Sequence, residues 1–374
     1  MPIVLDGTQG ISTPMYAGSI SSNPVTPSVN MKNRIINGNC VIDQRNAGAS
    51  VTATGSPFSV DRWQATVSQA AKFTIQQNAG AVTPPVGFTN YVGVTSSSAY
   101  SVLTGDYFIL NQTVEGFNIA DLGWGTANAK TITISFWVRS SLTGTFGLAL
   151  SNQDWNYSYP ASYTISVANT WEYKTVTIAG PTAGTWNTNN NGGVRVQFGL
   201  GVGSTYNGTA GSWASAQYLG TTGATSVVGT NGATFYITGV QLEVGSTATS
   251  FDYRPFGTEL ALCQRYYQFV GGEAVYQFVG TGMNYATNSS SIQIPILVRF
   301  RAIPSIGVSS VSHWAITYAS GAQAVATSIT DDQSGTTTVN VGVVVTGTPL
   351  TNGGAAKLIA TNTLSARLTM SAEL

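Results

Sequence analysis

The segment Thr-Ile-Thr-Ile-Ser-Phe-Trp-Val-Arg-Ser, residues 131–140, decides the fold class. Its apolar side chains stand at every second position, at Ile132, Ile134, Phe136 and Val138. Successive side chains of a β-strand point to opposite faces, so this alternation predicts a strand with one buried face. Residues 194–202 repeat the pattern. The sequence therefore predicts an all-β protein.

One predicted strand contains a break in its alternation. Within residues 233–244, Phe235 and Ile237 are in phase, and the pattern resumes one residue late at Val240. Gly239 lies at this slip, and glycine accepts the backbone conformations that a β-bulge requires. We expect one continuous strand with a bulge at Gly239.

A single segment has a convincing helix pattern. Thr258 is a suitable N-cap, and Glu259 suits the positive N-terminal end of a helix. We expect a short connector helix over residues 256–268. Beyond it, period-two alternation returns at Ile292–Phe300 and reaches Leu374, so the terminal strand should pair within a sheet.

These signals divide the chain into four parts. Residues 1–32 are rich in Pro, Ser and Thr and poor in apolar side chains, which predicts an extended arm that a partner or chain symmetry orders. Residues 33–255 should form a β-sandwich, and residues 256–268 the connector helix. Residues 269–374 should form a second, smaller C-terminal β-sandwich.

Charged residues are scarce. The 374 residues include 15 Lys+Arg and 15 Asp+Glu, and charged residues make up 8% of the chain, against about 25% in an ordinary soluble domain. Without a basic excess we expect no nucleic-acid binding. No apolar run approaches the ~18–20 residues of a membrane span, so we expect no membrane insertion. Such an uncharged surface favours burial in a permanent oligomer.

The residue types that catalysis commonly uses are few. His313 is the only histidine, and no phosphate-binding loop, zinc motif or nucleophile elbow occurs. A glycosidase would need two carboxylates. The spacing pairs none of the candidates, which are Asp106, Glu115, Asp121 and Asp154. We expect no enzyme activity, no metal and no cofactor, with a polysaccharide depolymerase as an alternative.

The two cysteines, Cys40 and Cys263, are far apart in the sequence. They form neither a zinc knuckle nor a disulfide framework. Two free buried thiols in a reducing compartment are the expectation, and a single disulfide is the alternative.

Polar loops that carry aromatic rings are the remaining candidates for a site. Sugars present apolar C–H faces and many hydroxyls, which aromatic rings beside amides and carboxylates complement. The predicted glycan contacts are Trp155, Tyr157, Tyr159, Trp186, Asn189 and Trp213. Two alternatives are open: these rings could pack within the protein, or the receptor site could lie among Tyr276, Phe278, Tyr285, Trp314 and Tyr318.

An ordered series of motifs between residues 33 and 267 resembles a β-sandwich module of tailed-bacteriophage tail fibres. Its pieces are Asn33–Asn46, Asp61–Trp63, Tyr107–Gly116, Ile134–Val138, Gly239–Gly245, Phe251–Pro255 and Glu259–Tyr267. The segment Ile3–Ile11 is similar to the N-terminal start of such fibres. Each piece is short, but their common order makes the resemblance fairly specific.

The resemblance implies a jelly-roll module of carbohydrate-binding type, a homotrimer and a place in the virion tail. It implies that residues 1–32 bind baseplate or tail proteins and that the distal end binds polysaccharide or lipopolysaccharide on the host surface. Such a protein is made in the cytoplasm of the host bacterium. The expected function is a non-catalytic adhesin, and a structural tail or baseplate connector is the alternative.

Overall fold

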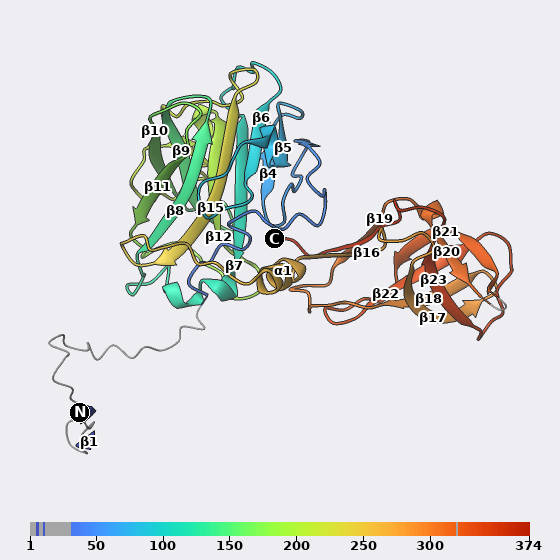
Figure 1. The fold of residues 1–374 in the computed structure, drawn as a ribbon. Coiled ribbons are helices and arrows are strands. Elements are labelled where there is room, and N and C mark those ends of the chain that lie inside the picture. Colours follow the sequence, from blue (N-terminus) through green and yellow to red (C-terminus); the bar gives the residue numbers. More distant parts are fainter. Residues whose placement is uncertain (1–4, 7–9, 12–30, 319–320) are drawn as a thin grey trace. The chain divides into compact units, whose positions relative to one another are not determined.

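The computed structural model describes residues 5–6, 10–11, 31–318 and 321–374, and most of its regular elements are strands (Figure 1). The predicted all-β class is confirmed. By its contacts the chain divides into Met1–Lys32 and Asn33–Leu374. The predicted arm lies mostly outside the described residues. Within it, β1 (Leu5–Asp6) pairs antiparallel with β2 (Gly10–Ile11).

Two antiparallel sheets form the β-sandwich. The first has five strands in the order β10 (Ser158–Ile165), β9 (Gly144–Asn152), β12 (Gly192–Val202), β7 (Tyr107–Glu115) and β4 (Gln64–Val67). The second has six, in the order β11 (Glu172–Ile178), β8 (Ile132–Ser140), β15 (Thr234–Val244), β6 (Val92–Ser96), β5 (Phe73–Gln77) and β3 (Val51–Thr52). The two segments with the clearest alternation are thus β8 and β12, one in each sheet.

Aromatic rings fill the space between the two sheets. Phe136 of β8 lies 5.1 Å from Phe198 of β12, and Phe146 lies 6.0 Å from Phe235, measured between ring centroids. All four side chains are fully buried. Burial of one such ring stabilises the fold by about 1.5–3 kcal/mol. Because alternate side chains enter this core, the residues between them point outward.

The predicted bulge at Gly239 is confirmed. Strand β15 pairs with β8 on both sides of an irregularity between Thr238 and Gln241. Gly239 lies inside this irregularity with a φ of 61°, a left-handed conformation that favours glycine.

Helix α1 spans Phe256–Gln264 and is shorter than the predicted connector, because residues from Tyr267 onward form strand β16 (Tyr267–Val270). The prediction of Thr258 as N-cap was wrong. The helix starts after Pro255, whose carbonyl accepts hydrogen bonds from the backbone N–H groups of Thr258 and Glu259. Among the described residues, no helix has the length and apolar character needed to span a bilayer.

The C-terminal part differs from the predicted second sandwich. Six of its strands close into a barrel in the order β17 (Phe278–Ala286), β18 (Ser289–Ile294), β22 (Val339–Val345), β21 (Gln323–Asp331), β20 (Trp314–Thr317) and β23 (Ala355–Ala360). Alternation alone does not separate the two forms, because strands of a barrel and of a sandwich both bury one face. The expected strand Ile292–Phe300 stops at Ile294, where Pro295 follows and lacks a backbone N–H.

A small three-stranded sheet joins the strand that follows α1 to the last strand of the chain. Strand β24 (Leu368–Ser371) pairs on one side with β16 and on the other with β19 (Ser305–Val308). The terminal strand is therefore paired within a sheet, as predicted. The remaining short elements are η1 (Ala79–Ala81), η2 (Gly116–Asn118), η3 (Ala120–Leu122), η4 (Ser204–Tyr206), β13 (Asn207–Gly208), β14 (Gly220–Thr221) and η5 (Val311–His313).

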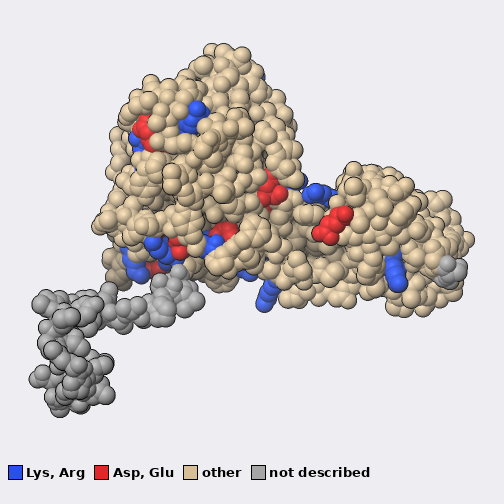
Figure 2. Space-filling view, viewed as in Figure 1, with Lys and Arg blue, Asp and Glu red and all other residues tan. Residues whose placement is uncertain are grey.

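The residues after β24 bind back to the sandwich through charged groups. The carboxylate of Glu373 forms salt bridges with the guanidinium groups of Arg45 and Arg62. Arg62 lies 3.6 Å from the ring centroid of Tyr266, and Arg45 lies 3.7 Å from that of Tyr267. The side chains of Arg45, Arg62 and Glu373 are shielded from water, and the face in Figure 2 shows few charged groups.

Candidate functional site

Four of the predicted glycan contacts lie in one aromatic cluster. Trp213 is at its centre, with ring centroids of Tyr159 at 5.2 Å, Trp186 at 5.4 Å and Tyr157 at 5.7 Å. Trp124 completes the cluster at 4.8 Å from Trp186. Trp186 is only 8% exposed. Its ring faces are therefore used largely in packing, which is the alternative that the sequence left open.

The other two predicted contacts lie outside this cluster. Trp155 occupies the turn between β9 and β10 with a φ of 58°, and the guanidinium of Arg195 lies 4.4 Å from its ring centroid. Asn189 is exposed, and its side-chain oxygen accepts a hydrogen bond from the backbone N–H of Asn191 at 2.9 Å. The role of all six residues in glycan binding stays a prediction.

Arg195 is the charged group that orders the neighbourhood of Trp155. Its guanidinium donates hydrogen bonds to Thr113 Oγ1 at 2.9 Å and to Gln153 Oε1 at 2.8 Å. Burial lowers the pKa of Arg195 to about 10, while the nearby Asp154 acts in the opposite direction. The arginine stays protonated at neutral pH and fixes the turn.

A groove of about 480 Å³ lies on the outer face of the six-stranded sheet. Ile134, Phe136 and Val138 of β8 enter the core, so the residues between them, Ser135 and Trp137, face this groove. We call it the aromatic groove. Its lining consists of Val86, Phe88, Ser135, Trp137, Tyr173, Gly239, Ser250, Phe251 and Tyr253.

Two groups of rings form the walls of the aromatic groove. Trp137 of β8 and Tyr173 of β11 are directly opposite in the strand register, with ring centroids 5.4 Å apart. Phe88, Phe251 and Tyr253 form the second group, with Phe88 5.2 Å from Phe251 and 5.6 Å from Tyr253. Tyr173 is 44% exposed and Tyr253 is 54% exposed. The groove therefore presents accessible ring surface to a ligand.

The bulge at Gly239 makes room for one of these walls. A Cβ atom on Gly239 would lie 2.6 Å from the ring of Phe88. The phenol of Tyr253 donates a hydrogen bond to the carbonyl of Gly87 at 3.0 Å, which fixes the loop that carries Phe88. The lining also includes hydroxyl groups, from Ser135, Tyr173, Ser250 and Tyr253. Apolar faces beside hydroxyls are the combination that a pyranose ring complements.

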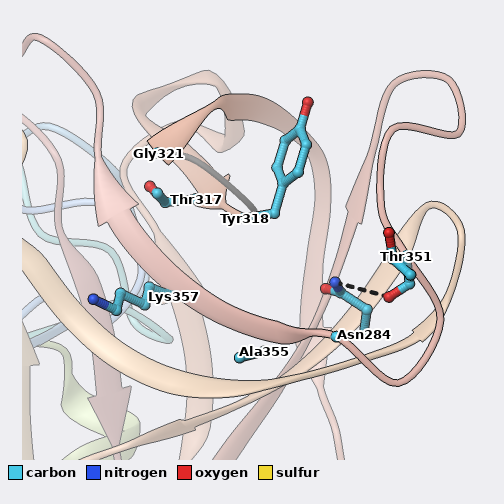
Figure 3. A pocket seen from close by; sticks show the side chains of 8 residues that line it. Asn284, Thr317, Tyr318, Gly321, Thr351, Ala355 and Lys357 are labelled. Carbon is cyan, nitrogen blue, oxygen red and sulfur yellow. Dashed lines mark hydrogen bonds between the residues drawn. The ribbon is translucent and has the colours of Figure 1, made fainter.

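A second pocket, of about 390 Å³, lies on the barrel (Figure 3). Asn284 and Thr351 lie at one end of the view and Lys357 at the other, with Tyr318 above them. The amide of Asn284 is already engaged, since it donates to the carbonyl of Thr351 at 3.2 Å and accepts from Ser290 Oγ at 2.7 Å. This pocket offers a single aromatic ring, so it is the weaker candidate for stacking on a sugar.

Sequence reasoning did not select the rings of the aromatic groove. Trp137, Phe251 and Tyr253 entered only as parts of motifs, and Phe88 and Tyr173 were not considered. One signal was available, because Trp137 occupies a solvent-facing position of a strand whose other face is apolar. Large rings at such positions are candidates for a binding surface.

Three of the carboxylates considered for catalysis have separate structural partners. Asp106 accepts hydrogen bonds from Ser68 and Tyr100, Glu115 pairs with Arg265, and Asp121 pairs with Arg34. His313 lies in the turn η5, directly before strand β20. Within the part of the chain that the structure describes, no three His, Cys, Asp or Glu side chains are grouped to hold a metal ion.

No family model matches the sequence, and no curated protein matches it. Among solved structures, the chain is similar to the enzymatically active domain of tailspike protein 4 from bacteriophage CBA120, with 11% identity and a TM-score of 0.30. That match covers 57% of this chain and 22% of the tailspike. A family 11 carbohydrate-binding module of Clostridium thermocellum matches with 14% identity and a TM-score of 0.27, over 52% of this chain and 98% of the module. Matches at this level identify neither a family nor a ligand.

Proposed function

We propose that the chain is a non-catalytic glycan-binding subunit of a bacteriophage tail fibre. As a homotrimer in the virion tail, it attaches the phage to polysaccharide or lipopolysaccharide on the host surface. The observation that carries this proposal is the aromatic groove, in which five rings line an open surface beside four hydroxyl groups. The motif series from Asn33 to Tyr267, which resembles tail-fibre modules, supports the place in the virion.

The trimer gives weak sites a useful affinity. One groove that stacks a few sugar rings binds weakly, because each contact is small and exposed to water. Three grooves on one particle convert later binding events into intramolecular ones, which raises avidity by about 10²–10⁴ without new contacts. Electrostatic repulsion between neighbouring copies is small, because only 8% of the residues are charged.

The test is binding of the full chain to an array of bacterial surface glycans. We expect binding to one glycan class, with no release of reducing ends. Tyr173→Ala should abolish the signal, because the exposed ring of Tyr173 forms one wall of the groove. Tyr285→Ala, at a 54% exposed tyrosine on a barrel strand, should bind as the unmodified chain does, and a loss of binding in this variant alone would favour the alternative receptor site on the barrel.

Three results would contradict the proposal. Binding to no glycan would favour the structural connector, in which the exposed rings of the aromatic groove contact another tail protein. Equal binding by Tyr173→Ala and the unmodified chain would show that the glycan binds outside the groove. Release of reducing ends from a bound polysaccharide would favour the depolymerase.

A further inference from the structure

Three arginines line one cavity beside the end of helix α1. The cavity has a volume of about 410 Å³, and its lining consists of Phe117, Asn190, Arg265, Arg299, Phe300 and Arg301. The whole chain contains 15 Lys and Arg residues. One fifth of its basic side chains therefore meet at this single site, which we call the arginine pocket.

The positive charge of the arginine pocket is only partly balanced. Arg265 forms a two-pronged pair with Glu115, with Nε 2.8 Å and Nη2 2.5 Å from its carboxylate oxygens. No carboxylate oxygen of a described residue lies within 4 Å of the guanidinium groups of Arg299 or Arg301. The three arginines and Glu115 together leave two positive charges around the cavity.

The backbone holds Arg301 at the wall of the pocket. Its N–H donates to the carbonyl of Arg265 at 3.1 Å, and its carbonyl accepts a hydrogen bond from Asn190 Nδ2 at 2.9 Å. The Nε of Arg301 is buried and has no hydrogen-bond partner among the described residues. Burial lowers the pKa of Arg301, while the charge of Glu115 opposes this. A bound anion would supply the missing charge.

We propose that the arginine pocket binds the acidic group of an anionic saccharide. A guanidinium group matches a carboxylate or a phosphate with two parallel hydrogen bonds. Phe117, which is 59% exposed, provides an apolar surface beside the charges for the C–H face of a sugar. The saccharide part rests on the proposed function, whereas the anion site rests on the arginines alone.

Calorimetric titration of the full chain with four probes tests this inference: glucuronate, glucose 6-phosphate, inorganic phosphate and glucose. We expect the anionic probes to bind and glucose not to bind here, with affinity falling as salt is raised. Arg299→Gln should weaken anion binding about ten-fold or more, the typical effect of one lost charge-assisted hydrogen bond. Lys357→Gln, which removes an exposed cation on the barrel, should leave it unchanged.

The probes distinguish the two sources of acid. Tighter binding of glucuronate assigns the pocket to a uronic acid, and tighter binding of glucose 6-phosphate assigns it to a phosphorylated sugar. Binding of inorganic phosphate alone, lost in Arg299→Gln, keeps the anion site and overturns the saccharide. Equal affinity for glucose and glucuronate, or anion binding unchanged in Arg299→Gln, overturns the whole inference.

Failure of the anion site can be distinguished from failure of the proposed function. Tyr173→Ala, in the aromatic groove, should leave titration with inorganic phosphate unchanged. Because Arg299 is exposed, its substitution should not unfold the chain, and a circular dichroism spectrum checks this. Arg301→Gln provides a second measurement at the half-buried member of the pocket.

Discussion

The ring of Phe88 occupies the space beside Gly239 that a side chain would need. A Cβ atom at Gly239 would lie 2.6 Å from the Phe88 ring, which is closer than real Cβ contacts. Phe88 belongs to a loop before β6, and Gly239 lies in the bulge of β15. A glycine that the sequence marks as a break in alternation thus shapes one wall of the aromatic groove.

Substitution at this bulge should damage both the fold and the groove. Gly239→Ala places a Cβ at a φ of 61°, which costs about 1–2 kcal/mol, and it also pushes Phe88 from its position. Gly232→Ala is the matched control, because Gly232 has a φ of 74° and no atom within 4 Å of the added Cβ. Urea unfolding should show a loss about 1–3 kcal/mol larger for Gly239→Ala. Equal losses in the two variants would mean that the Phe88 contact does not matter.

Trp186 should stabilise the fold. Its ring lies 4.8 Å from Trp124 and 5.4 Å from Trp213, and its side chain is buried. Trp186→Ala should lower the free energy of unfolding by about 3–5 kcal/mol, as large-to-small changes of buried rings do. Trp155→Ala, at a partly exposed ring outside this cluster, should cost clearly less. Chemical denaturation of the two variants decides the matter, and a negligible loss for Trp186→Ala would refute the packing role.

Asp61 should make the free energy of unfolding depend on pH between the pKa of its carboxyl in the unfolded chain and its pKa in the folded chain. Burial raises the pKa of Asp61 from 3.8 to about 6, although Arg45 and Gln44 act in the opposite direction. The folded chain therefore holds a proton that the unfolded chain releases, and this contribution to stability is lost as the pH rises from about 4 to 6. Relative to the unmodified chain, the free energy of unfolding of Asp61→Asn should rise by up to about 3 kcal/mol between pH 4 and pH 7. Urea titrations at both pH values measure this difference, and a difference that does not change with pH would contradict it.

Both thiols should resist chemical modification while the protein is folded. Cys40 and Cys263 are free and buried, and burial raises the pKa of each thiol. Because the thiolate is the reactive form, we expect no reaction with a thiol reagent at pH 8 and reaction of both thiols after unfolding in urea. Rapid labelling of either thiol in the native protein would show that its surroundings open to solvent.

The sequence predicted those features that depend on neighbours along the chain. The alternation in residues 131–140 gave β8, and the slip at Gly239 gave the bulge. Closure of the six barrel strands was missed, since it depends on the pairing of β17 with β23 at the two ends of the sheet. The aromatic groove was missed for a similar reason, because Phe88 and Phe251 meet only after the sandwich has folded.

The most direct test of glycan binding is calorimetric titration of the glycan that the array selects into the unmodified chain and into Trp137→Ala. Trp137 lines the aromatic groove and faces away from the core, so its removal should leave the fold intact. We predict binding to the unmodified chain and an affinity lowered about ten-fold or more in the variant, as loss of one stacking ring and its buried surface implies. An unchanged affinity in a folded Trp137→Ala protein would contradict the account.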